Sequence, residues 1–160
     1  MAHAHSGTLS STRSTLDAAA ALPLDGAFSA AAVALLARSD AELVAAQLAV
    51  DPQERFLHAH LAAIRAGAAL LEVTGRPRGR RAPRTVWDMV GAVAPELSRW
   101  TSFFAGGAAL RGALESGRGA EVDEARAELT VTVAEDFQDA VRSVLASHAA
   151  DQGSLSLRAS

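Results

Sequence analysis

The sequence predicts an all-α protein, and three observations support this. Alanine, the residue with the highest helix propensity, occurs 38 times in 160 residues, while aromatic residues make up only 4%. Apolar side chains recur every three or four positions over long stretches, which is the period of a helix with one buried face. Prolines and glycines mark the breaks between these stretches. With 49% apolar residues the chain can bury a core, and we expect one up-and-down helical bundle.

The composition excludes several kinds of chemistry. The chain has no cysteine and therefore no disulfide, thiolate metal site or cysteine nucleophile. All 15 basic side chains are arginine, as expected of a GC-rich bacterial genome, and a net charge of −3 argues against nucleic-acid binding over the whole surface. The uninterrupted apolar stretch at residues 26–37 is far shorter than the roughly 20 residues that span a bilayer. We therefore expect a cytoplasmic protein without membrane attachment.

The first part of the chain is predicted to hold little regular structure. Residues 1–25 are rich in Ser, Thr, Gly and Ala without period, which is typical of a disordered tail. Residues 26–150 are expected to form the bundle and to begin with two short extra helices, at about 27–37 and 40–49. Ser39 is a suitable cap for the second of them.

The first long helix has clear ends. Asp51 is a good N-cap and Pro52 suits the first helical position, while Gly75 followed by Pro77 ends the helix. In the following loop, residues 76–84, two prolines and a glycine exclude a regular helix. Because an arginine fork matches phosphate geometry, the arginines of this loop are candidate phosphate-binding residues: Arg76, Arg78, Arg80, Arg81 and Arg84. The same charges would also keep an exposed linker in solution.

A short helix and two further long helices are expected to complete the bundle. Thr85 caps the short helix, and Pro95 starts a long helix whose apolar stripe contains Gly106 and Gly107. Two glycines inside a helix indicate a close approach of a neighbouring helix or a kink. The last helix opens with acidic residues, which suit its positive end, and is expected to end near residue 150. Residues 151–160 would then form a flexible polar tail.

The five histidines do not form a metal site. His58 and His60 lie two residues apart, so on a helix their rings point to opposite sides. His60 borders the apolar stripe and is expected to be a packed core histidine. His3 and His5 fall in the predicted tail, and His148 near the end of the last helix would suit its negative end. We expect no bound metal and no cofactor.

Three segments together are similar to a known family. They are HAHLAAIRAGAALL from His58, VWDMV from Val86 and WTSFFAGG from Trp100. Over about residues 52–149 the chain resembles the HEPN superfamily, and most closely a stand-alone branch from GC-rich Gram-positive bacteria. The resemblance implies a HEPN helical bundle, often a homodimer, that acts by binding. Its partner would be a nucleotide, RNA or a nucleotidyltransferase-like protein.

The resemblance also implies a candidate enzymatic activity. Many HEPN proteins are metal-independent endoribonucleases with an Arg, a polar neighbour and a His a few residues later. The Arg would stabilise phosphate charge and the His would transfer the proton of the 2′-hydroxyl. Arg142, Ser143 and His148 match this motif, and Arg55 and His60 have its spacing without the polar neighbour. At this spacing on a helix the side chains point about 120–140° apart, so a shared site needs a kink or a second subunit. Binding module, endoribonuclease and structural partner subunit all remain open.

Overall fold

The computed structural model describes residues 28–159, and these residues form five α-helices, one 3-10 turn and no strand. The elements are α1 (Ala30–Leu48), α2 (Pro52–Thr74), α3 (Val86–Val93), η1 (Pro95–Leu97), α4 (Ser98–Glu115) and α5 (Glu124–Arg158). The all-α prediction is confirmed. The predicted tail, with His3 and His5, lies outside the described residues.

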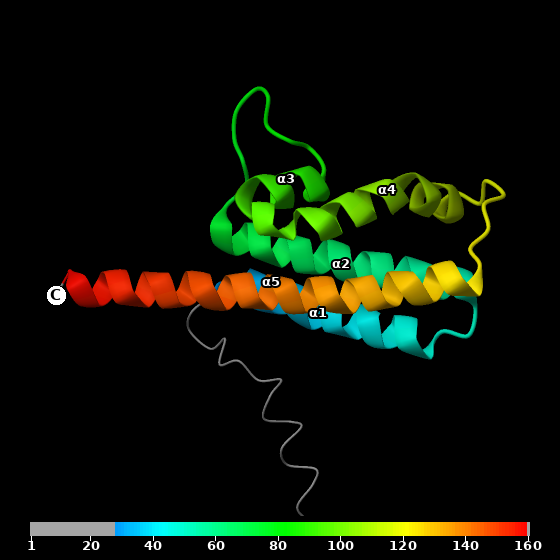
Figure 1. Ribbon diagram of the computed structural model, residues 1–160, viewed down its shortest axis with the longest axis horizontal. Helices are drawn as coiled ribbons and strands as arrows, with labels where there is room; N and C mark the ends of the chain where they lie inside the picture. The colour runs from blue at the N-terminus through cyan, green and yellow to red at the C-terminus, as the bar shows by residue number, and fades with distance from the viewer. Residues whose placement is uncertain (1–27, 160) are drawn as a thin grey trace, which may run out of the picture.

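The four long helices form an up-and-down bundle around α2. In Figure 1, α2, α4 and α5 each run opposite to the long helix before them in the chain, and α3 lies beside α4. The central helix α2 contacts each of the other four α-helices. By length and composition α2 would also suit a membrane span, but more than half of its apolar stretch is buried inside the bundle, as in the core helix of a globular domain. The predicted bundle architecture is confirmed.

Local signals set most helix ends. The carboxylate of Asp51 accepts a hydrogen bond from the backbone N–H of Glu54, and the hydroxyl of Thr85 accepts one from that of Asp88. These caps satisfy N–H groups that the first helical turn leaves without partners. Gly75 ends α2 with a φ of 85°, a backbone conformation that favours glycine. The predicted boundaries of α2 and the predicted start of α3 are confirmed.

The prediction of two short helices at 27–37 and 40–49 is wrong, because α1 is one continuous helix. Ser39, the predicted cap, lies inside α1 and is fully buried. Its hydroxyl donates to the carbonyl of Ala62 at 2.7 Å and accepts from Nε2 of Gln138 at 2.9 Å. Since α2 and α5 supply these partners, the hydroxyl is not available to compete with the backbone of its own helix.

The predicted end of the last helix near residue 150 is also wrong, because α5 continues to Arg158. No proline follows that position, and the single Gly153 costs only about 1 kcal/mol in a helix interior. The residues of this last segment are all exposed, and Figure 1 shows it extending past the rest of the bundle. A polar sequence here marks a solvent-exposed part of the helix rather than its end.

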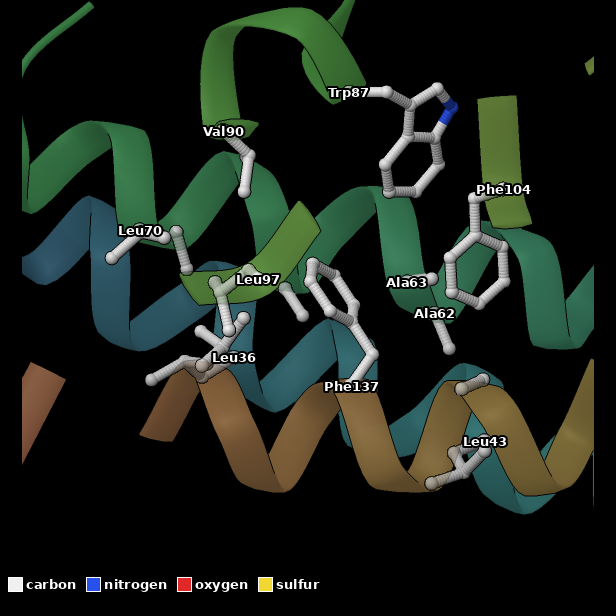
Figure 2. Packing of buried hydrophobic residues seen from close by; sticks show 14 of the residues in the cluster. Leu36, Leu43, Ala62, Ala63, Leu70, Trp87, Val90, Leu97, Phe104 and Phe137 are labelled. Carbon is white, nitrogen blue, oxygen red and sulfur yellow. The ribbon is translucent and has the colours of Figure 1, made fainter. Parts of the chain in front are cut away.

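The core combines aliphatic contacts with an aromatic cluster. Figure 2 shows Trp87, Phe104 and Phe137 converging from α3, α4 and α5. The rings of Trp87 and Phe104 stack with their centroids 5.0 Å apart, and Phe137 lies 5.8 Å from Phe104. The ring of His60 packs edge-on against Phe104 at 5.2 Å, which confirms the prediction of a core histidine. These contacts fix α3 and α4 against α2 and α5.

Candidate functional site

The basic loop stands clear of the bundle. Figure 1 shows residues 76–84 as an open loop that rises past α3, away from the bundle, and all five arginines of the loop are exposed. Nη2 of Arg76 lies 3.6 Å from a carboxylate oxygen of Glu72. No ion pair or hydrogen bond within residues 28–159 engages the other four: Arg78, Arg80, Arg81 and Arg84. The loop is therefore a local positive surface on a chain of net negative charge.

A cavity of about 500 Å³ lies where the start of α1, the end of α2 and the second half of α5 meet. Its polar lining includes Ser29, Glu72, His148 and Gln152. Nε2 of His148 lies 3.5 Å from Nε2 of Gln152. Because Glu72 also pairs with Arg76, the basic loop begins at the edge of this cavity. An imidazole, a carboxylate and an arginine therefore lie at the same end of the bundle.

The other residues of the predicted catalytic motif lie elsewhere on α5. Nη2 of Arg142 lies 2.8 and 2.9 Å from the two carboxylate oxygens of Asp40 on α1. The hydroxyl of Ser143 donates to the carbonyl of Asp139 in its own helix. Arg142 is therefore bound to α1, and it is not among the residues that line the cavity beside His148. In one copy of the chain, Arg142, Ser143 and His148 therefore do not form one site.

The alternative pair is also separated by the fold. Arg55 forms an ion pair with Glu124 and donates to the carbonyl of Ala49, with Nη2 2.9 Å from the oxygen. His60 points to the other side of α2, where Nε2–H donates to the carbonyl of Phe104 at 3.2 Å. Arg55 therefore joins the α1–α2 turn to α5, and His60 joins α2 to α4. Arg55 and His60 each make contacts that hold helices together, and no residue is a partner of both.

The environment of His60 sets its protonation. Burial lowers the pKa of His60 to about 4, and the positive charge of Arg111 adds to this shift. The imidazole is therefore neutral at pH 7. An imidazole with such a low pKa is a weak base at this pH, which makes His60 a poor candidate for general base catalysis.

Two arginines that no motif singled out lie next to His60. They are Arg111 on α4 and Arg126 in the first turn of α5, and the positive charge of each contributes to the lowered pKa of His60. Arg111 follows Gly107 by four residues, so the two positions fall on the same face of α4. The spacing of Gly107 and Arg111 was the one signal in the sequence that could have pointed to this cluster. Nothing near Arg126 in the sequence indicated that α5 would bring it there.

Comparisons with known proteins identify the family. The model of the SAV_6107-like HEPN family matches residues 45–142, while no curated protein and no solved structure matches the chain. The match includes the basic loop and the segments that resemble the HEPN superfamily. It ends at Arg142, so His148 and the part of α5 that lines the cavity lie beyond it. Because the match spans more than half of a helical bundle of the expected architecture, the chain belongs to the SAV_6107-like HEPN family.

Proposed function

We propose that this HEPN protein is an RNA-binding module whose basic loop, residues 76–84, holds the phosphate backbone. The observation that carries the proposal is the set of exposed loop arginines that have no carboxylate partner among residues 28–159: Arg78, Arg80, Arg81 and Arg84. Arginines that neutralise phosphates release counterions from the nucleic acid, and this release supplies binding free energy. The overall charge of −3 argues against such binding over the whole surface, so a local positive segment is needed.

A run of phosphates suits this loop better than a single nucleotide does. The unpaired arginines are spread along the loop from Arg78 to Arg84, and all four are exposed. Single-stranded RNA presents phosphates at regular intervals along a flexible chain, so each arginine can contact a different one. The proposed ligand is therefore single-stranded RNA, bound without base specificity by this loop.

Replacing the four unpaired loop arginines together by glutamine should weaken binding to a single-stranded RNA oligonucleotide at least tenfold at about 0.1 M salt. Each lost phosphate contact removes about 0.7 from the slope of log K against log salt, so the slope should fall by up to about 3. Fluorescence anisotropy over a salt series measures both quantities. The matched control carries lysine at the same four positions and should keep the slope. A glutamine variant with unchanged affinity and slope would contradict the proposal.

The alternative function is a metal-independent endoribonuclease that uses Arg142, Ser143 and His148. It is favoured by one observation, that His148 lines the cavity next to the Arg76–Glu72 pair. Because Arg142 is bound to Asp40 in each copy of the chain, this ion pair would have to open before Arg142 of either subunit could contact RNA. Incubating RNA with the protein in EDTA, beside a His148→Ala variant, distinguishes the two functions. Cleavage that the variant loses would favour the enzyme, and equal products from both would exclude His148.

We also propose that the module is a homodimer formed through the outer face of α1. This face carries an exposed apolar stripe along the whole helix: Ala30, Ala34, Ala37, Ala41, Val44 and Leu48. Val44 is 52% exposed and Leu48 is 76% exposed. A contiguous apolar surface of this kind is typical of an interaction site. In a dimer with a two-fold axis, the stripe of one subunit packs against the same stripe of the other, and its alanines allow the two α1 helices to approach closely.

Leu48→Glu is expected to convert the dimer to a 16.5 kDa monomer, because the carboxylate would be buried against the apolar stripe of the second copy. Size-exclusion chromatography with light scattering measures the mass. The matched control is Leu129→Glu, since Leu129 is 50% exposed on α5 and lies outside the stripe. A wild-type protein that is monomeric at tens of micromolar would contradict the dimer.

A further inference from the structure

We propose that Arg111 and Arg126 form a binding site for a phosphate-type oxyanion where α2, α4 and α5 meet, beside Gly107. The two arginines come from different helices. A Cβ atom placed on Gly107 would lie 3.2 Å from Nε2 of His60 and 3.7 Å from Nη2 of Arg126. The missing side chain therefore lets α4 approach α2 and lets the guanidinium of Arg126 reach their seam. Arg111 lies one helical turn further along the same face of α4.

Three buried nitrogen atoms in this cluster have no hydrogen-bond partner. They are Nδ1 of His60, Nε of Arg111 and Nε of Arg126, and no other buried side-chain nitrogen or oxygen in the described part of the chain lacks one. His60 itself is only 1% exposed. A buried polar group without a partner costs about 1–3 kcal/mol, and such groups are few in native proteins. Because Nε2–H of the neutral His60 donates to the carbonyl of Phe104, its Nδ1 carries a lone pair, and only the two arginine Nε–H groups are free donors. No residue among 28–159 supplies an acceptor to either of them.

The two guanidinium groups have few carboxylate contacts. Nη1 of Arg111 lies 3.9 Å from a carboxylate oxygen of Glu115, near the limit of an ion pair. The guanidinium of Arg126 pairs with no carboxylate among the described residues: Glu124 is engaged by Arg55, and the carboxylate of Asp123 accepts from the backbone N–H of Arg126. The ring of Phe103 lies 5.7 Å from Cζ of Arg126 and offers no hydrogen-bond acceptor in its plane. The positive charge of this pair of arginines is therefore only partly balanced by direct contacts within residues 28–159.

The free donors define the chemical class of the ligand. Both Nε–H groups need acceptors, and both guanidinium groups need negative charge, so the ligand is an anion with several oxygen atoms. The Nε–H and Nη–H groups of an arginine form a fork that matches two oxygens of a phosphate group. The ligand is therefore inorganic phosphate or the terminal phosphate of a small molecule.

This site is separate from the basic loop. His60 lies 14 residues before Thr74, where α2 ends, which corresponds to about 21 Å of helix. The two sites share no arginine, so loss of one is not expected to abolish the other. The variant with glutamine at the four loop positions should keep its affinity for the oxyanion. This result separates failure of the RNA-binding proposal from failure of the oxyanion site.

The site can be tested by NMR on the full-length ¹⁵N-labelled protein at constant ionic strength. One titration uses inorganic phosphate and a second uses adenosine 5′-monophosphate, which distinguishes the two sources of the group. In at least one of them, the Nε–H resonances of Arg111 and Arg126 should shift and saturate. The Nε–H resonance of Arg99 should not, because its guanidinium lies over the ring of Trp100, 3.9 Å from the centroid. Absence of a saturable shift in both titrations would overturn the proposal.

Substitutions provide the second measurement. Arg126→Gln and Arg111→Gln should each weaken binding at least tenfold, while the matched control Arg99→Gln, with the same loss of charge, should bind as the wild type does. Circular dichroism verifies that each variant is folded. If Arg126→Gln fails to fold, Arg126→Lys keeps the charge without the fork and should still weaken binding severalfold. Equal affinity in the wild type and in a folded Arg126 variant would show that the anion binds elsewhere.

Discussion

Replacing Phe104 by alanine is expected to lower the free energy of unfolding by about 3–5 kcal/mol, the range for truncation of a buried phenylalanine. Phe104 is fully buried on α4. Its ring stacks on Trp87 and packs against Phe137 and His60, so its loss opens a cavity at the junction of α2, α3, α4 and α5. Urea denaturation followed by circular dichroism measures the change.

Two further variants keep this prediction testable. A domain of this kind is stable by only about 5–15 kcal/mol, so Phe104→Ala can unfold outright. Phe104→Leu fills most of the cavity and should therefore cost clearly less than the alanine variant. Leu129→Ala, at a half-exposed position on α5, should cost less than about 1 kcal/mol. A loss as small as this for Phe104→Ala would show that the aromatic cluster does not organise the core.

Lowering the pH from 7 to 5 is expected to remove about 2 kcal/mol of stability through His60 alone. The pKa of His60 falls from 6.5 in the unfolded chain to about 4 in the folded protein, chiefly because the ring is buried. Between these two values the unfolded state binds the proton and the folded state does not. Stability is therefore fully present above pH 6.5, falls as the pH drops toward 4, and levels off below it.

The His60→Gln variant isolates this effect from the other titrating groups. The amide has no proton to gain in this range and keeps an N–H donor of similar reach for the carbonyl of Phe104. Urea denaturation of both proteins at pH 7 and pH 5 gives the difference, and the wild type should lose about 2 kcal/mol more than the variant. Equal losses in the two proteins would mean that His60 is protonated in the folded state or is not buried.

The helices were largely predictable because their signals are local. Asp51 and Thr85 cap helices through backbone groups three residues away, and Gly75 ends α2 through its own backbone freedom. Ser39 carried the same kind of local signal and misled, because its partners Ala62 and Gln138 lie on other helices. A capping residue predicts a helix start only where no distant group competes for its side chain.

The candidate sites also divide into one that local signals predict and one that depends on distant residues. The loop arginines were predictable, since Pro77, Gly79 and Pro83 exclude a helix whatever surrounds them. The spacing of Arg142 and His148 could not predict their placement, because Asp40 binds the arginine from a helix more than one hundred residues earlier in the chain. A spacing along one helix does not specify which neighbours its side chains meet.

Residue types and their spacing were enough to predict the all-α class, most helix boundaries and an exposed arginine loop, because propensity, capping and turn formation act within a few residues. Which polar groups meet depends instead on how the helices pack. Arg126 and His60 lie 66 positions apart in the chain, and they reach the same point because Gly107 lets α4 close on α2. Their proximity depends on packing between three helices, and no local pattern encodes it.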